Sequence, residues 1–446
     1  MSIPSSAFRA PALKKNLHMS RLTAIVVAST FAAAAAASLP AQAAAGPALE
    51  QAARSATYAL DDLIALARRD NAALQAVRAQ ALAARAGITS ARAYPNPEIE
   101  LLRGPVRPLI AGGPAGSGAS VSFSQRLENP ALRGARAGVA EAAASAAGIG
   151  VRAAENNLIA LIKTQFFEVL RRQEELAAAD EDLALTQQIR DRIAVRVRTG
   201  EGARFDLLRA DNEMALAAKE VERARAGVAQ ARAGLKGAVG SPLPERYTLA
   251  GDFYKSIPQA DYNILRELTT SANPELRRAA ADVTRAERQV EVERQQVLPA
   301  LSLRLTQDTS PDTRSTRAGI ALSVPLWDRR AGPVDEARAQ WLRSRSESES
   351  RRFELTQAFE AAWHQFAAAS TTVRALEGGI LQQARSIVDI AEAAYRFGER
   401  GILEYLDARR QFRQTRNDLI GARFDLYVTK TELERLAARD LQDIPE

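Results

Sequence analysis

RTGEGARFDLL at residues 198–208 and RFGERGILEYL at residues 396–406 are two similar stretches of the chain. In each stretch an arginine is followed two residues later by Gly-Glu, and then by an apolar run that contains one acid. The two stretches lie about 200 residues apart, and self-similarity at a fixed spacing indicates a duplicated unit. Glycine supplies the positive φ that a tight reversal needs, so each stretch predicts a turn between two helices. We expect the turn residues to be Gly200, Gly202, Gly398 and Gly401.

The helices that lead into these turns are too long for a globular domain. Residues 132–198 contain no proline, which allows about 65 residues of helix and a length of roughly 100 Å. Residues 333–397 match this segment in the second half. Shorter helices are expected at residues 58–93, 203–239, 262–298 and 403–440. The apolar faces of the two long helices are wide and rich in alanine, which favours a curved wall of antiparallel helices.

Each half also contains two short segments with strict alternation of apolar and polar residues. They lie at residues 98–101, 120–124, 301–306 and 319–323. One apolar and one polar face suit a water-filled membrane barrel, although a half-buried antiparallel sheet gives the same pattern. Residues 104–118 are rich in Gly and Pro and predict an exposed, irregular loop. Because closed membrane barrels begin at eight strands, a chain with four must oligomerise, and three copies would supply twelve.

The N-terminus has the pattern of a secretory signal peptide, which we place at residues 1–43. A basic region precedes the apolar run 22–37, and Ala41-Gln42-Ala43 resembles a cleavage site. A membrane-spanning helix is the alternative, but the run is shorter than the roughly 20 residues that a span needs. The start is Met1 or Met19. We assign residues 44–240 to the first repeat, 241–260 to an equatorial linker with several prolines, and 261–446 to the second repeat.

Composition excludes several kinds of site. The chain has 446 residues, no cysteine and two histidines, so it predicts no thiolate or histidine metal site and no cofactor. We find no nucleophile–base pair and no phosphate loop, and we expect no enzyme. Lysines and arginines are interleaved with acids, which indicates a solvated surface and no nucleic-acid partner.

With these features together, the chain resembles the TolC-like outer-membrane efflux factors. The most specific segments are VPLWD at residues 324–328 with Gly332, and YRFGERGILEYLD at residues 395–407. SQRLE at residues 124–128, followed by Pro130 and Arg133, is similar to the CzcC-like branch, which serves heavy-metal exporters of the resistance–nodulation–division (RND) type.

The resemblance implies a mainly α fold with a small β part. Three chains would form a homotrimer with a twelve-stranded barrel in the outer membrane and a helical barrel in the periplasm. The partners would be a periplasmic adaptor, docked at the tip turns, and an inner-membrane RND pump. The channel would conduct substrate passively, and the CzcC-like segments favour cobalt, zinc, cadmium or nickel cations. Since the chain has no N-terminal cysteine to carry a lipid, the barrel would be its only anchor.

The resemblance also implies where the channel closes. Glu404 and Asp407 are three residues apart and share a helix face, so three copies would place six carboxylates around the axis as a cation ring. Arg400, Asp206 and Tyr395 match residues that lock neighbouring helices through charge-assisted hydrogen bonds. By spacing alone, these acids could equally be solvated residues at a helix start.

Two other functions fit parts of the sequence. The same duct could serve drug efflux or type I secretion, which the sequence barely separates from metal export. A periplasmic coiled-coil structural protein is the alternative from a different class. It would be water-soluble with little β structure.

Overall fold

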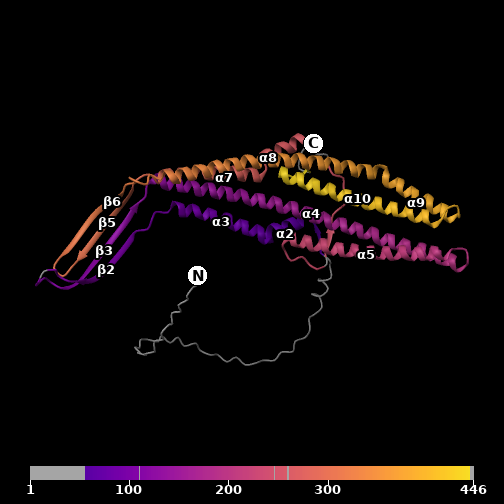
Figure 1. The fold of residues 1–446 in the computed structure, drawn as a ribbon, viewed down its shortest axis with the longest axis horizontal. Coiled ribbons are helices and arrows are strands. Elements are labelled where there is room, and N and C mark those ends of the chain that lie inside the picture. The colour runs from indigo at the N-terminus through magenta and orange to yellow at the C-terminus, as the bar shows by residue number, and fades with distance from the viewer. Residues whose placement is uncertain (1–55, 110, 246, 259–260, 442–446) are drawn as a thin grey trace, which may run out of the picture. The chain divides into compact units, whose positions relative to one another are not determined.

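The computed structural model describes residues 56–109, 111–245, 247–258 and 261–441. The chain separates into two units, Met1–Arg54 and Ser55–Glu446, and the description below concerns the second. The predicted signal peptide, residues 1–43, lies outside the described residues. In the second unit, a four-stranded sheet lies at one end and two helical hairpins reach the other (Figure 1).

The helices repeat in the same order in both halves. The first half contains α2 (Leu60–Asp70), α3 (Ala72–Arg92), α4 (Pro130–Arg198) and α5 (Arg204–Val239). The second contains α6 (Tyr262–Ser271), α7 (Pro274–Gln295), α8 (Ala331–Ala375), η1 (Leu376–Ile380), α9 (Leu381–Arg396) and α10 (Ile402–Ala437). The duplication and the long antiparallel helices are therefore confirmed. The single helices expected at 58–93 and 262–298 are wrong, because each is two helices.

Two buried asparagines explain these breaks. The side chain of Asn71 accepts a hydrogen bond from Leu74 N (3.0 Å) and caps α3, while its amide donates to Ala238 O (3.1 Å) at the end of α5. Asn273 does the same in the second half: it accepts from Glu275 N (2.8 Å) and donates to Leu436 O (2.9 Å) in α10. Each asparagine thus satisfies free groups of two helix ends at once.

We expect Asn273→Ala to destabilise the helical part, because it leaves a helix N-terminus and a buried carbonyl without partners. The expected loss is about 1–3 kcal/mol of unfolding free energy. Circular dichroism of the detergent-solubilised protein during chemical unfolding measures it. Asn263→Ala, at an exposed position of α6, is the matched control. Equal unfolding free energies of the two variants would show that the hydrogen bonds of Asn273 do not stabilise the helical part.

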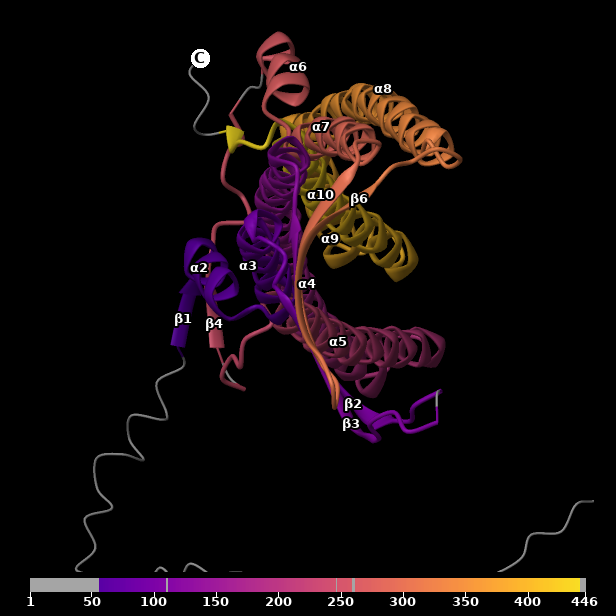
Figure 2. The same cartoon turned by 90° about the vertical axis from the view of Figure 1, so that its left-hand side faces the viewer.

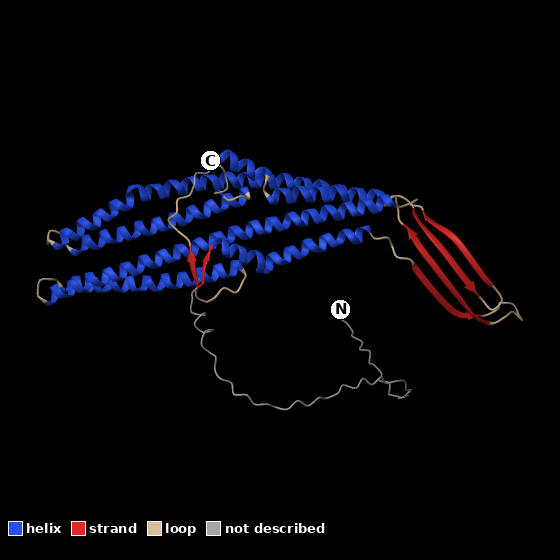
Figure 3. Ribbon diagram, turned by 180° about the vertical axis from the view of Figure 1, so that it is seen from behind, coloured by secondary structure: helices blue, strands red, loops and turns tan. Residues whose placement is uncertain are grey.

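A small parallel sheet, which the sequence did not predict, lies beside the helices. β1 (Ala56–Ala59) pairs with β4 (Tyr247–Ala250), with Ala56 opposite Tyr247. The two strands run next to α2 (Figure 2) and lie midway along the helical part (Figure 3). β4 belongs to the segment 241–260 that we expected to be an equatorial linker.

The four-stranded sheet is antiparallel in the order β2 (Glu98–Val106), β3 (Gly116–Leu127), β5 (Ala300–Thr309) and β6 (Arg314–Ser323). The strands are longer than predicted, and the expected loop 104–118 shrinks to residues 107–115. The alternation is confirmed. The apolar face is exposed and carries Ile99, Leu101, Val121, Phe123, Leu303, Leu305, Ile320 and Leu322.

Polar side chains on the opposite face of this sheet bond to one another. Ser120 Oγ donates to Asp308 (2.6 Å), Arg317 also pairs with Asp308, and Ser122 Oγ donates to Glu100 (3.3 Å). The two faces of this sheet thus differ sharply in polarity.

None of the helices among the described residues has an apolar stretch long enough to span a bilayer.

Candidate functional site at the hairpin tips

The two hairpin tips have the same backbone structure. In the first, Glu201 N bonds Arg196 O (2.8 Å) and Gly200 N bonds Val197 O (3.2 Å). In the second, Glu399 N bonds Ala394 O (2.9 Å) and Gly398 N bonds Tyr395 O (3.2 Å). This pair of bonds is the Schellman motif, and it requires a left-handed residue after the helix end.

Only two of the four predicted turn glycines have the expected conformation. Gly200 (φ 84°) and Gly398 (φ 76°) are left-handed. Gly401 is extended (φ −73°, ψ 159°) and precedes α10, so our expectation of a positive φ there is wrong. Gly202 is also not among the left-handed glycines; a Cβ there would lie 3.2 Å from Val197 Cγ2. Close packing therefore explains Gly202.

An apolar core joins the two hairpins just above the tips. It is built from α4, α5, α9 and α10 and contains the buried residues Ile189, Ile193, Ala210, Val388, Ile402, Tyr405, Leu406 and Ala408. The rings of Tyr395 and Tyr405 stack, with centroids 6.1 Å apart and planes 9° from parallel. Burial raises the pKa of the Tyr405 phenol, so it stays neutral and serves packing.

The two predicted ring acids lie on the exposed side of α10. Glu404 accepts two hydrogen bonds from Arg400 Nη1 (3.1 and 3.0 Å), and Asp407 accepts one from Arg410 Nη1 (3.2 Å). The side chains of Glu404 and Asp407 remain 53% and 67% exposed. Both carboxylates are thus paired with an arginine and still accessible from outside the chain.

The structure does not join the three predicted lock residues within one chain. Arg400 pairs with Glu404, and Tyr395 stacks on Tyr405 and lies under the guanidinium of Arg196 (5.6 Å). Among the described residues, no hydrogen bond links Arg400, Asp206 and Tyr395. The side chain of Arg400 is 63% exposed in the single chain.

Sequence reasoning missed an ion-pair seam between the halves of the chain. Asp182 of α4 is buried and accepts from Arg409 Nη2 (3.0 Å) and Arg413 Nη1 (2.8 Å) of α10. Nearby, Arg410 pairs with the buried Glu213 of α5, and this hydrogen bond raises the pKa of Arg410. Arginines at 409, 413 and 416 recur with helical spacing, which is the signal that could have indicated a charged contact face.

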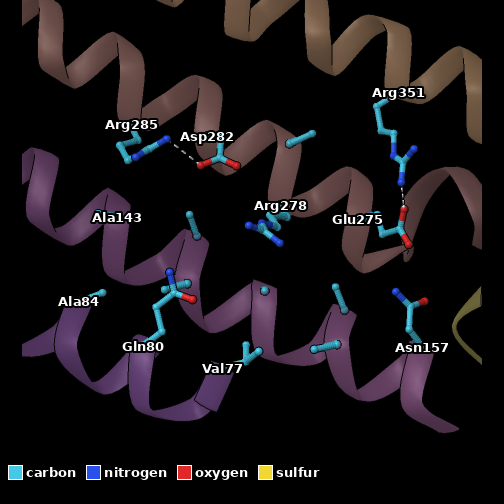
Figure 4. A pocket seen from close by; sticks show the side chains of 16 residues that line it. Val77, Gln80, Ala84, Ala143, Asn157, Glu275, Arg278, Asp282, Arg285 and Arg351 are labelled. Carbon is cyan, nitrogen blue, oxygen red and sulfur yellow. Dashed lines mark hydrogen bonds and ion pairs between the residues drawn. The ribbon is translucent and has the colours of Figure 1, made fainter. Parts of the chain in front are cut away.

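A large groove lies farther from the tips, where α3, α4 and α7 meet. It has a volume of about 780 Å³, and alanines and Gly150 of α4 form its floor. Arg278 of α7 lies above Gly150, and the ion pairs Asp282–Arg285 (3.2 Å) and Glu275–Arg351 (2.5 Å) border the groove (Figure 4). Small residues allow the arginine stem to lie against α4, so we interpret the groove as a packing feature.

Comparison with known families decides what these hairpins belong to. The profile of the family described as outer membrane efflux protein matches residues 63–241 and again residues 265–439. The chain belongs to this family. The two matches correspond to the two halves of the chain, and the TolC-like resemblance predicted from the turn segments is confirmed.

Among the relatives of this outer membrane efflux protein is a metal-resistance protein. The chain is 25% identical over 382 residues to the cobalt-zinc-cadmium resistance protein CzcC of Cupriavidus metallidurans, covering 85% of this chain and 90% of that protein. The fold is similar to that of the channel OprN (TM-score 0.74, 19% identity, covering 86% and 90%). It is equally similar to CusC (TM-score 0.73, 19% identity, covering 85% and 91%).

Metal-binding geometry is not found among the residues that the structure describes. They contain no group of three or more His, Asp or Glu side chains that could hold an ion. Glu404 and Asp407, the two acids predicted for the cation ring, each pair with an arginine of the same chain. A cation ring would therefore need carboxylates from several copies.

Proposed function

We propose that three copies of this outer membrane efflux protein form one duct of a tripartite RND-type efflux system. The duct passively conducts substrate from an inner-membrane pump and a periplasmic adaptor to the outside. One observation carries the proposal: a four-stranded sheet with two open edges and an exposed apolar face is joined to duplicated hairpins of great length.

Strand directions support closure by a second copy of the chain. The order β2-β3-β5-β6 is antiparallel throughout, so β2 and β6 run in opposite directions. The free edge of β6 can thus pair with the free edge of β2 from a neighbour and continue the antiparallel pattern. An open edge in lipid would leave backbone groups unpaired at several kcal/mol each, so closure is strongly favoured.

The tips are the proposed place of the gate and of adaptor docking. Glu404 and Asp407 from each copy form the cation ring. Arg400 forms hydrogen bonds with Asp206 and Tyr395 in the assembled trimer, and these bonds hold the hairpins closed. The turns at Gly200–Gly202 and Gly398–Gly401 contact the adaptor. The exposed Arg400 and the two exposed acids support this assignment.

Heavy-metal cations are the proposed substrate class. The similarity to CzcC over most of both chains supports this choice. Carboxylate rings attract divalent cations but discriminate poorly among them, so we assign selectivity among cobalt, zinc, cadmium and nickel to the pump.

We expect deletion of the gene to make the cells more sensitive to cobalt, zinc, cadmium or nickel salts, because the pump could then no longer pass these ions through the outer membrane. Growth inhibition of the deletion strain, measured with and without the gene restored, tests this. Sensitivity to dyes and antibiotics is the matched comparison. A strain that becomes sensitive only to drugs, or that fails to secrete a protein, would assign the duct to one of the alternatives.

A further inference from the structure

The apolar face of the four-stranded sheet ends in a row that contains two arginines. Arg103 of β2 is opposite Ala119 of β3. Ala119 is opposite Thr309 of β5, and Thr309 is opposite Arg314 of β6. Directly opposed residues share one face of a sheet. Because Arg103 is two residues from the exposed Leu101, this row lies on the face that carries the exposed apolar side chains.

Charge is distributed unevenly between the two faces of the sheet. The four strands contain five arginines and three acids. Alternation places all of the acids and three of the arginines on the polar face: Glu98, Glu100, Asp308, Arg126, Arg304 and Arg317. Arg103 and Arg314 are the arginines of the apolar face, and both are exposed. Two positive charges therefore lie on a face that has no carboxylate among the strand residues.

The arginine row lies at the end of the sheet that is farther from the helices. β6 begins at Arg314, whereas the helices join the other end of the sheet (Figure 1). Trp327, which is 94% exposed, follows β6 on that helical side, and exposed tryptophan is typical of a bilayer boundary. The 10 residues of β6, tilted by about 40°, span about 24 Å, close to the roughly 25 Å of a membrane barrel's apolar band. Arg314 and Trp327 thus mark opposite boundaries of this band.

The surface between the two arginines is suited to a headgroup with phosphate. Ala119 and Thr309 are small, so they leave the space between the two guanidinium groups open. Three strand spacings of about 4.8 Å separate β2 from β6, which places the backbones of Arg103 and Arg314 about 14 Å apart. Each guanidinium has five donors in a planar fork that binds phosphate bidentately. The row can therefore bind two phosphate groups of one headgroup.

Closure of the sheet by further copies would concentrate this charge. β2 and β6 are the two edge strands, so in the proposed trimer Arg314 lies on the strand next to the one that carries Arg103 of the next copy. Like charges on neighbouring strands are destabilising. Bound anions would remove this repulsion, so an assembled wall has more reason to bind them than a single chain.

We propose that Arg103 and Arg314 bind the phosphate groups of a phosphorylated glycolipid in the outer leaflet of the outer membrane. The phosphates of such a lipid lie between its sugars and its acyl chains, which is the boundary that the arginine row marks. The acyl chains would pack on the exposed Leu101 and Val121 of the next row. This apolar neighbourhood favours a lipid over a free phosphate ion. The inference rests on the proposed function, because it takes the sheet as part of a trimeric wall in that membrane.

Native mass spectrometry of the detergent-extracted trimer tests this site. The probe is diphosphorylated lipid A in mixed detergent micelles, and the lipid molecules bound to each trimer are counted as the lipid concentration rises. We expect Arg103→Gln with Arg314→Gln to weaken binding about 25-fold, because each arginine near an anionic lipid surface contributes about a fivefold factor in affinity. Each single variant should lose about fivefold, and the single variants are used if the double variant does not assemble.

Two arginines on the other face of the same sheet provide the matched control. Arg126→Gln with Arg304→Gln removes the same charge from exposed positions of β3 and β5 and should leave lipid A binding unchanged. Lipid A without its phosphates should bind the unmodified protein as weakly as the Arg103→Gln, Arg314→Gln variant binds the diphosphorylated form. Inorganic phosphate at the same phosphate concentration should not bind measurably.

The outcomes separate the lipid site from the proposed function. Equal affinity for lipid A in the two double variants would overturn the site, and so would equal binding of lipid A with and without its phosphates. Tight binding of inorganic phosphate would overturn the assignment to a lipid. If the trimer conducts ions in bilayers but does not bind lipid A, the proposed function stands and the lipid site fails. If it binds lipid A through both arginines but conducts no ions, the lipid site stands and the proposed function fails.

Discussion

Asp206→Ala combined with Arg400→Ala should open the channel and raise its conductance in planar bilayers. Hydrogen bonds to charged groups contribute about 1.5–3 kcal/mol each. Loss of even one should shift the closed–open equilibrium at least about tenfold toward the open state. The tip core around Tyr405 stays intact in this variant, so the expected change is one of opening and not of folding.

The control for this experiment is a second ion pair near the same tips. Arg190 and Asp211 bond each other at 2.8 Å within the first hairpin, away from the lock. Arg190→Ala with Asp211→Ala should leave the conductance near that of the unmodified channel. If the lock variant also conducts like the unmodified channel, Arg400 and Asp206 do not close the pore.

Glu404→Ala with Asp407→Ala should weaken block by multivalent cations applied from the periplasmic side. Six carboxylates around the axis would be lost in a trimer, and we expect the apparent dissociation constant for block to rise about tenfold or more, equivalent to about 1.4 kcal/mol. Titration of a trivalent cation against single-channel current measures this.

Exposed acids far from the tips provide the comparison. Glu220 and Glu222 lie on α5, and their side chains are 38% and 71% exposed. Glu220→Ala with Glu222→Ala removes the same charge per chain and should leave block unchanged. Block that persists undiminished in Glu404→Ala with Asp407→Ala would place the cation ring elsewhere.

Periodicity predicted the parts of the fold that depend on local sequence. Alternation placed all four strands of the larger sheet, and the Gly-Glu pairs placed both tips, because these features are encoded within a few residues. Our helix predictions at 58–93 and 262–298 failed for a different reason. Asn71 looks like an ordinary polar helix residue until α5 supplies the carbonyl that its amide bonds. Asn273 is followed by Pro274, a local signal for a helix start that our prediction did not use.

Contacts between distant segments were beyond sequence reasoning. β1 and β4 have four residues each and pair across about 190 positions, so neither gives a signal alone. The Asp182 seam needs α4 and α10 to be side by side before its arginines have a meaning. The lock of Arg400, Asp206 and Tyr395 stays a prediction, because in the single chain Arg400 pairs with Glu404 instead.

The mass of the purified protein shows whether the chain forms a trimer, because the duct exists only if several chains share one wall. Protein extracted from outer membranes with detergent, and analysed by light scattering with the detergent mass subtracted, should have three times the mass of the processed chain. A single chain that dissolves freely without detergent would show that the protein forms no such duct.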